Sequence, residues 1–341
     1  MGGKKPTSVD IAYLAGVSQA TVSRALRGSE LVSKATRERI LEVARQLNYR
    51  TDRNAANLRS QQTQTLALLI YEDPTSDHSH INPFFLSMLG TITREASRQG
   101  YDLLVSFQQL SEDWHTEYEL SNRADGIILL GYGNFLQYEE KLRALVEADA
   151  HFVIWGPFSD DQPDHFLSCD NREGGRLAAQ HLCELGRRRI VFVGSRSEGF
   201  PEFRLRFEGF RSVLEEQGIE FDEKLQVDCD NQETSGRRAI ELLLFRGDEF
   251  DAVFCASDLI AIGVIQALRA RGVDVPGDVS VVGFDDIPAA AYFNPPLTTI
   301  RQNTRLAGRM LVGRLLAQIA GRPTDRELVP VEKIVRESCS G

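Results

Sequence analysis

The sequence has no long apolar run and few cysteines, and both shortages exclude classes of protein. No stretch of about 18 apolar residues occurs, so no segment is expected to span a membrane. The cysteines are odd in number, and none forms a C-x-x-C pair. Because they lie within or beside apolar runs, we expect buried thiols in a reducing cytoplasm instead of disulfides or a zinc site. They are Cys169, Cys183, Cys229, Cys255 and Cys339.

Signatures of enzymes are also missing. The chain contains no G-x-x-x-x-G-K-S/T, H-E-x-x-H or G-x-S-x-G motif, and Gly131-Tyr132-Gly133 lacks the third glycine of a dinucleotide loop. His78 and His80 lie among carboxylates, but their spacing across a loop is weak evidence for a metal site, and we favour a lid or rim loop there. We therefore predict a protein that is not an enzyme and that holds no metal and no cofactor.

Charge is distributed unevenly along the chain. The net charge is −10, yet residues 1–61 carry eleven basic and five acidic side chains. A cationic head on an acidic chain indicates one module that faces a polyanion and a larger body with another task, although a small domain can also be charged by chance. The first residues, MGGKKPTSVD, lead into a polar helical pattern instead of the apolar stretch of a secretory signal, which favours a cytoplasmic location.

The head contains three helices with recognisable ends. Thr7 is placed to cap the first, with Asp10 completing a shortened capping box, and Gly16 is expected to end it in a left-handed conformation. Ser18 caps a second helix over residues 19–26, and Ser33 caps a third. The join of only three residues between the first two helices defines a helix-turn-helix. The first helix has Val9, Ile11, Ala12, Leu14 and Ala15 as its apolar face, and the third has Ile40, Val43, Ala44 and Leu47.

The second helix has a surface suited to the major groove of DNA. Val22 and Leu26 are needed to pack on the first helix, which leaves short hydrogen-bonding groups, a methyl group and a cation on the other side. Amides and guanidinium groups read purine edges, a methyl group contacts thymine, and hydroxyls bind phosphate. The alternative is a plain solvated face, but the tight turn and the positive charge together favour DNA. The predicted contacts are Gln19, Ala20, Thr21, Ser23 and Arg24, joined by Thr7, Ser18, Asn48 and Tyr49.

These residues carry a resemblance to a known family. The stretch from VDIAYLAGVSQATVSRALRG to LNYRTDRNAANLRS resembles the head of the lactose-repressor/galactose-repressor (LacI/GalR) family of bacterial transcription regulators. The matching motifs are AGVS-x-x-TVSR, VS-x-x-TR and LNY before a linker. The resemblance continues at family landmarks to the C-terminus and implies the two-lobed periplasmic-binding-protein type I fold behind the head.

Residues 52–63 form a predicted hinge. The segment DRNAANLRS has helix-forming residues but only about two turns of length, so it is marginal as an isolated helix. The resemblance implies that two such helices pair across a dimer and insert a leucine pair into the minor groove. Leu58 is the matching residue, with Ala55 and Arg59 beside it as minor-groove contacts. The alternative is a flexible tether with Leu58 folded against the body.

The acidic body alternates apolar strands with helical patterns. Such runs are typical of parallel sheets covered on both sides, and about 275 residues are too many for one sheet, so two lobes are expected. We assign residues 64–164 and 303–323 to an N-terminal lobe and residues 165–302 and 324–341 to a C-terminal lobe, behind a head of residues 1–51. Strands are predicted at residues 66–71, 103–107, 126–130, 152–155, 190–193, 252–256 and 279–284.

Polar and aromatic side chains follow several of these strands, where ligands bind in open parallel sheets. Carboxylates and guanidinium groups bridge neighbouring hydroxyls, and aromatic faces cover the apolar side of a sugar ring. By resemblance, Arg206 and Asp285 match the pair that holds effector hydroxyls, and Ser257 stands where an asparagine is frequent. The structural alternative is that Asp285 caps a turn and Trp155 belongs to the core. The full predicted effector set is Phe84, Phe85, Trp155, Asp170, Arg204, Arg206, Asn231, Ser257, Asp258, Asp285 and Gln302.

These patterns predict a transcription regulator, most simply a repressor, whose affinity for a palindromic operator is controlled by a small sugar. Trp155 weakly favours a glucoside or disaccharide, and the sugar either releases DNA or promotes binding. The alternative, a periplasmic-type sugar-binding protein, is disfavoured by the cationic head. A homodimer is expected because two heads must read a palindromic site, and no heptad repeat that could join a tetramer follows the core. The helix expected over residues 304–321 has more apolar residues than one lobe needs, so half of it could face a partner.

Overall fold

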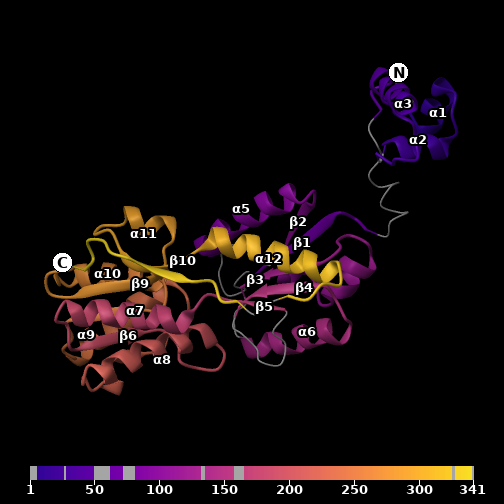
Figure 1. Cartoon of the computed structure of the whole chain (residues 1–341). Coiled ribbons are helices and arrows are strands. Elements are labelled where there is room, and N and C mark those ends of the chain that lie inside the picture. Colours follow the sequence, from indigo (N-terminus) through magenta and orange to yellow (C-terminus); the bar gives the residue numbers. More distant parts are fainter. Residues whose placement is uncertain are drawn as a thin grey trace. The chain divides into compact units, whose positions relative to one another are not determined.

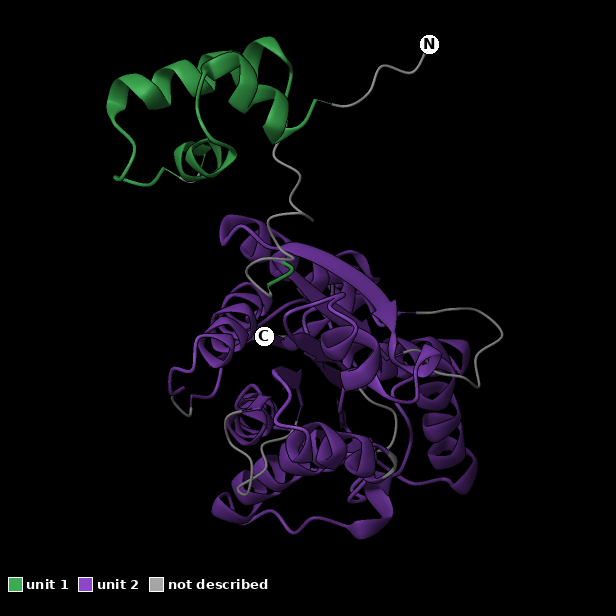
Figure 2. Cartoon of the chain, turned by 90° about the vertical axis from the view of Figure 1, so that its right-hand side faces the viewer, with its two compact units in different colours: residues 1–63 green, residues 64–341 purple. Residues whose placement is uncertain are grey.

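The computed structural model describes residues 6–26, 28–49, 62–71, 81–131, 135–156, 165–324 and 327–339. The chain divides into two compact units, residues 1–63 and residues 64–341, which are coloured separately in Figure 2. Each unit has an apolar core of its own: Ile11, Val22 and Ile40 lie in a cluster made only of head residues. The head and the body are therefore separately folded modules.

The head consists of α1 (Ser8–Ala15), α2 (Gln19–Leu26) and α3 (Lys34–Gln46). The predicted caps are confirmed. Thr7 and Asp10 form a capping box, Gly16 has φ +66°, and the hydroxyl of Ser33 accepts a hydrogen bond from the amide of Thr36. Local hydrogen bonding by these short side chains thus sets the helix ends.

The predicted apolar face of α1 is partly wrong. Ile11, Ala12 and Ala15 are buried, but Val9 and Leu14 are each 57% exposed. An eight-residue helix packed on two others buries only one stripe, so residues one position beside that stripe remain in solvent. In α2 Val22 and Ala25 are buried, and Leu26 is half-buried and packs against the same cluster.

The first lobe of the body is built on a five-stranded parallel sheet in the order β2-β1-β3-β4-β5. Its strands are β1 (Thr65–Ile70), β2 (Asp102–Phe107), β3 (Ile127–Leu130), β4 (Phe152–Trp155) and β5 (Phe166–Leu167). Leu66 and Leu68 on β1 pack with α5 (Pro83–Arg98) and α12 (Thr304–Ile319), whereas Ala67 and Leu69 face a second cluster that includes Trp114 and Leu142. Both faces of the sheet are therefore covered, as the continuous apolar strands predict.

The second lobe is built on a six-stranded sheet in the order β11-β10-β9-β8-β6-β7, in which only β11 is antiparallel. The strands are β6 (Ile190–Val193), β7 (Gln226–Val227), β8 (Ala252–Cys255), β9 (Ser280–Asp285), β10 (Thr298–Gln302) and β11 (Val331–Ile334). Figure 1 shows this sheet among α7 (Asn171–Glu184), α8 (Pro201–Glu216), α9 (Glu233–Arg246), α10 (Asp258–Ala270) and α11 (Pro288–Tyr292). The remaining elements are α6 (Phe135–Glu147), the 3-10 turns Gln108–Leu110 and Glu223–Leu225, and a π-helix over His115–Leu120.

All seven predicted strands are present, with ends shifted by at most one residue. The short β5 joins the first sheet just beyond residue 164, where we placed the lobe boundary, because Ile154 and Trp155 pair with Phe166 and Leu167. Leu311, Val312 and Leu315 of α12 are buried in the lobe core, whereas Leu306, Met310, Leu316 and Ile319 are half-buried, so the expected partner face of this helix stays a prediction. The five cysteines are free thiols that are buried or half-buried, as predicted.

The contact between α7 and α8 requires glycine. A Cβ on Gly175 would overlap the carbonyl oxygen of Arg206, whereas a Cβ on the exposed Gly313 in α12 would meet no atom within 4 Å. We expect Gly175→Ala to lower the free energy of unfolding by about 3 kcal/mol, because the two helix backbones must separate. Gly313→Ala, the matched control, should leave it unchanged or raise it by about 1 kcal/mol through better helix propensity. Urea unfolding measures both, and equal stabilities would contradict this account of the packing.

Candidate functional site

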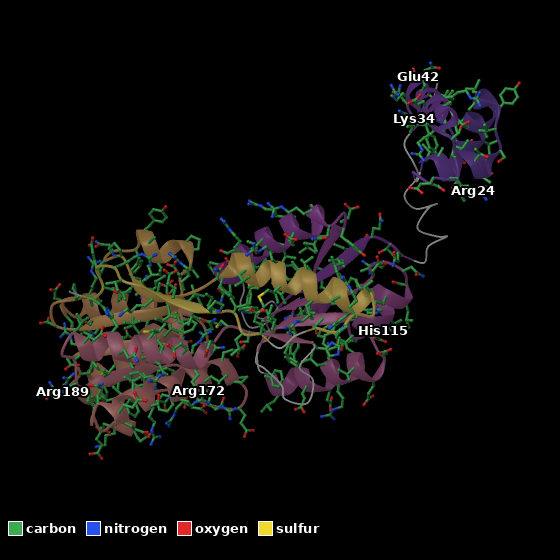
Figure 3. The ribbon with its side chains drawn as sticks, in the orientation of Figure 1. Arg24, Lys34, Glu42, His115, Arg172 and Arg189 are labelled. Carbon is green, nitrogen blue, oxygen red and sulfur yellow. The ribbon has the colours of Figure 1, made fainter. Side chains whose placement is uncertain are left out.

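The head presents a polar surface on α2. Gln19, Ala20 and Arg24 are exposed, and Thr21 and Ser23 are half-buried. The side chain of Arg24 is labelled in Figure 3. Amide, methyl, hydroxyl and guanidinium groups thus share one helix that follows a three-residue turn, an arrangement that can read base edges in a major groove.

The other predicted head contacts serve partly as caps. The hydroxyl of Thr7 donates to Asp10 at 2.8 Å, and Ser18 accepts from the amide of Thr21 at 3.2 Å. Asn48 is exposed with φ +49°, and Tyr49 packs against the head core. The hinge residues Ala55, Leu58 and Arg59 lie outside the described residues, as do His78 and His80.

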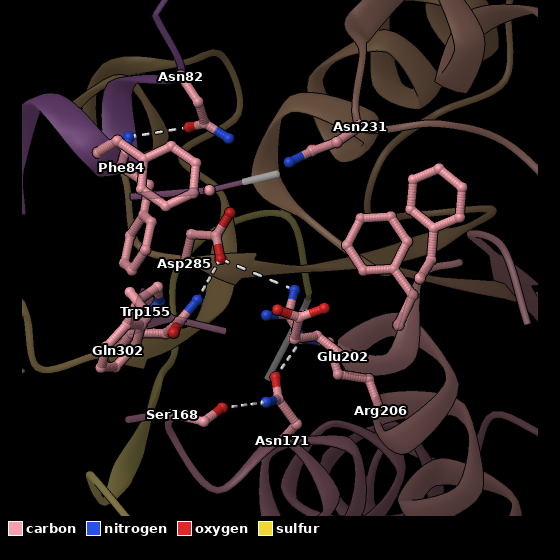
Figure 4. A pocket seen from close by; sticks show the side chains of 14 residues that line it. Asn82, Phe84, Trp155, Ser168, Asn171, Glu202, Arg206, Asn231, Asp285 and Gln302 are labelled. Atoms are coloured by element: carbon pink, nitrogen blue, oxygen red, sulfur yellow. Dashed lines mark hydrogen bonds and ion pairs between the residues drawn. The ribbon is translucent and has the colours of Figure 1, made fainter. Parts of the chain in front are cut away.

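A cavity lies between the two lobes of the body, with about 650 Å³ of space that is open to solvent. Seven of the predicted effector residues line it: Phe84, Phe85, Trp155, Arg206, Asn231, Asp285 and Gln302. Figure 4 shows Phe84 and Trp155 on one side, Arg206 and Glu202 on the other, and Asp285 between them. Residues far apart in the sequence therefore meet beside the carboxyl ends of the strands, where open parallel sheets bind ligands.

Arg206 on α8 is fixed from several directions although it lies in the cavity wall. Its Nε donates to Asn171 Oδ1 at 2.8 Å, and its Nη1 donates to the carbonyl of Ala256 and lies 3.8 Å from Asp285 Oδ1. The guanidinium carbon lies 3.6 Å from the centroid of the Phe284 ring. Only 5% of the residue is exposed, so this cation is held in place before any ligand binds.

Asp285 ends β9 and is also buried. It accepts a hydrogen bond from Gln302 Nε2 at 2.6 Å, and its φ of +117° is unusual for a residue with a side chain. Burial raises the pKa of Asp285 to about 6, although Arg206 and Gln302 act to lower it. The buried Oε1 of Gln302 has no hydrogen-bond partner among the described residues, which leaves it for a donor on a ligand.

The raised pKa of Asp285 predicts a pH dependence. A carboxyl whose pKa is higher in the folded than in the unfolded state stabilises the fold below its unfolded pKa and loses that contribution as pH rises through the folded value. The free energy of unfolding of the wild type should therefore contain a part that falls between about pH 4 and pH 6. Asp285→Asn should remove this part, which urea unfolding at several pH values detects. Parallel pH profiles for the two proteins would contradict the burial of an ionisable Asp285.

Four predicted effector residues lie outside the lining of the cavity. Asp258 is fully buried, accepting from the amide of Ile287 at 2.8 Å and the hydroxyl of Thr299 at 2.5 Å. Burial and the charge of Asp285 raise the pKa of Asp258 well above its usual range. Ser257 caps α10 and Asp170 caps α7. Arg204 is two residues from Arg206 but lies 3.8 Å from Glu208 instead. A polar residue that follows a strand can either cap the next helix or contact a ligand, and the sequence alone does not distinguish these two roles.

The cavity also contains residues that the sequence analysis missed. Polar groups are contributed by Asn82, Ser168, Asn171 and Glu202, and apolar surface by Gly131, Phe200 and Phe203. Asn171 and Ser168 lie at the crossover from β5 to α7, which pairs with a distant segment at Val329. One signal was available: Phe200 and Phe203 stand beside Arg204 and Arg206 in one aromatic-rich stretch.

The sequence predicts neither a metal-binding cluster nor a membrane-spanning helix. In the part of the chain that the structure describes, no group of three or more histidine, cysteine or acidic side chains could hold a metal ion. None of the described helices combines the length and the apolar composition needed to cross a membrane.

Two family descriptions match the chain. Residues 8–52, which include α1 to α3, match the bacterial regulatory proteins of the lacI family. Residues 179–339, which include most of the second lobe and α12, match the periplasmic binding protein-like domain. The cationic head and the lobed body therefore each match a family of their own, over separate parts of the chain.

Individual relatives match over nearly the whole chain. The HTH-type transcriptional regulator CelR of Thermobifida fusca is 33% identical over 342 residues, which cover 98% of each chain. The ribose operon repressor of Escherichia coli strain K12 is 29% identical and covers 97% of this chain and 98% of its own. A solved CelR–cellobiose complex has a TM-score of 0.72 at 33% identity, covering 98% of this chain and 99% of that one.

A second solved structure extends the match to a DNA complex. The lac repressor dimer bound to operator and the anti-inducer ONPF has a TM-score of 0.79 at 27% identity, covering 98% of this chain and 99% of that one. The helix-turn-helix head and the two lobes are thus shared with these regulators over nearly their full length. The chain belongs to the LacI family of bacterial transcription regulators.

Proposed function

We propose that this protein is a cytoplasmic repressor that binds a palindromic operator as a homodimer and whose operator affinity is controlled by a small neutral sugar. The observation that carries the proposal is a buried arginine–aspartate pair, Arg206 and Asp285, in an aromatic-lined cavity of a chain that also has a helix-turn-helix head. Paired donors and acceptors between aromatic walls are the groups that sugars require.

DNA binding is assigned to the head and the hinge. The exposed groups of α2 are proposed to read base edges, and Thr7, Ser18, Asn48 and Tyr49 to contact the DNA backbone. Leu58, with Ala55 and Arg59, is proposed as the minor-groove element of a hinge over residues 52–63. Two-fold pairing of heads gives a palindromic site, and the similarity to the operator-bound lac repressor dimer supports this arrangement.

The cavity favours an uncharged ligand. Among the described residues that line it, the one arginine is already paired with Asp285 and bonded to Asn171, and the carboxylate of Glu202 raises the pKa of Asp285 by its charge. A phosphate ester would bring a further negative charge to these two carboxyl groups. Five aromatic rings among the lining residues instead suit the C–H faces of a pyranose. The similarity to the solved CelR–cellobiose complex supports a glucose-based disaccharide.

Control of DNA binding is proposed to follow from closure of the lobes. Ligand held from both lobes favours the closed arrangement, which shifts the two cores of a dimer and determines whether the hinge segments can pair on DNA. A coupling free energy of about 1–3 kcal/mol would change operator affinity about 5- to 150-fold.

A thermal-shift comparison tests the ligand class. Cellobiose at about 100 times its Kd should stabilise the protein by about 2.7 kcal/mol, because it binds only the folded state. Lactose, ribose and glucose 6-phosphate serve as comparisons, and the phosphate ester should give no shift. A shift with glucose 6-phosphate, and none with any neutral sugar, would refute the proposed ligand class.

A further inference from the structure

Asn171 joins the ligand-binding arginine to the connection between the lobes. It is the first residue of α7, only 2% exposed, and directly follows the crossover segment that leaves β5. This segment is hydrogen-bonded to the connection that leads from α12 to β11, since the amide of Val329 donates to Ser168 O at 2.9 Å and the amide of Asp170 donates to Val329 O at 3.0 Å. Asn171 therefore lies where two of the chain crossings between the lobes are paired.

The side-chain amide of Asn171 forms hydrogen bonds both with the crossover and with Arg206. Its Nδ2 donates to Ser168 Oγ at 3.0 Å and to Cys169 O at 3.2 Å, both on the crossover. Its Oδ1 accepts from Arg206 Nε at 2.8 Å. A carboxamide supplies two donors and an acceptor in one plane, which neither a carboxylate nor an aliphatic side chain does. The side chain is thus matched to bridging the backbone and the guanidinium group.

This bridge decides how Arg206 is presented to a ligand. The bond at Nε and the bond from Nη1 to the carbonyl of Ala256 fix the plane of the guanidinium group over the Phe284 ring. Among the described residues these bonds leave the Nη2 donors for a ligand. If the crossover moves as the lobes close, Asn171 moves the guanidinium group with it.

We propose that Asn171 is a positioning residue, which holds Arg206 in the orientation that binds the ligand and ties that orientation to the crossover between the lobes. The inference rests on the proposed function, because it concerns the same cavity. The inference adds that replacement of Asn171 lowers sugar affinity because Arg206 loses its orientation, and not because Asn171 itself contacts the sugar.

Calorimetric titration with cellobiose tests this in the full-length protein. Asn171→Leu, which has a similar volume and no polar group, should weaken binding about 10- to 100-fold, since a buried bond to a charged group is lost. Asn171→Asp keeps the oxygen that accepts from Nε but loses the donors to Ser168 and Cys169, so its cellobiose affinity should lie between that of the wild type and that of Asn171→Leu. If leucine prevents folding, Asn171→Ser removes the same bond with a smaller side chain and should show the same loss.

A double-mutant cycle separates positioning from direct contact. Arg206→Lys has no Nε, so adding Asn171→Leu to it should cost less than about twofold more in cellobiose affinity. The same loss in both backgrounds, or binding by Asn171→Leu within twofold of the wild type, would overturn the inference. Failure of the wild type to bind cellobiose would instead refute the proposed ligand, so the two failures are distinguishable.

Discussion

Replacement of Arg206 by alanine is expected to weaken cellobiose binding by about 100-fold or more while operator binding in the absence of sugar is retained. The side chain is buried, bonded to Asn171 and Ala256, and 3.8 Å from Asp285. Its removal takes away the charged donor and leaves the buried Asp285 without its counter-charge, and truncation of such a pair costs several kcal/mol. Calorimetric titration of cellobiose and an operator-binding assay measure the two effects separately.

The matched control for this variant is two residues away. Arg204 is on the same helix, but it lies beside Glu208 and outside the lining of the cavity. Arg204→Ala should bind cellobiose within about threefold of the wild type, because exposed ion pairs contribute little. If both variants bound the sugar like the wild type, the ligand would have to occupy another site.

Removal of residues 1–61 is expected to abolish operator binding and leave the thermal stabilisation by cellobiose intact. The core of the head is made of head residues alone, and neither core cluster of the body includes any of them. The body should therefore fold without the head, while the surface proposed to read DNA is lost. Gel-shift and thermal-shift assays on the same preparation measure the two properties.

Arg24→Ala in the full-length chain provides the milder comparison. Its exposed guanidinium group should contribute about 1–3 kcal/mol of base discrimination, so specific affinity should fall while the cellobiose shift is unchanged. If the truncated body neither bound operator nor responded to the sugar, the modules would not be separable, and the assignment of sugar binding to the body alone would be wrong.

Local signals explain why so much of the fold was predictable. Thr7, Ser18 and Ser33 form hydrogen bonds within a few residues of themselves, so their positions in the sequence determine the helix starts. Six of the seven apolar runs of the body are strands that are almost entirely buried, whereas β2, at the edge of its sheet, is only half-buried. Four strands were missed, the two-residue β5 and β7 and the more polar β10 and β11, because pairing with a neighbour, and not their own pattern, makes them strands. Exposure of Val9 and Leu14 likewise depends on how three helices pack.

The residues of the candidate site likewise include some that the sequence predicts and some that only the packing of the chain brings to the cavity. Arg206, Asp285 and Gln302 were found because residues at strand ends and in family motifs could be named from the sequence. Ser257 and Asp258 satisfy the same rule, yet Ser257 caps α10 and Asp258 bonds to β10 and the start of α11, because the cavity extends only part of the way along the strand ends. Asn171 and Ser168 lie in the cavity because a crossover between the lobes places them there. The pairing of this crossover with the distant segment at Val329 is visible only in the structure.

The central claim is that what occupies the cavity controls how tightly the head holds DNA. It is tested most directly by titrating the full-length protein onto a palindromic operator duplex, with and without saturating cellobiose, at several salt concentrations. The account predicts salt-dependent affinity that prefers the palindrome over a scrambled duplex and changes about 5- to 150-fold when the sugar is present. Affinity that is the same with and without the sugar, although cellobiose binds the protein, would contradict it.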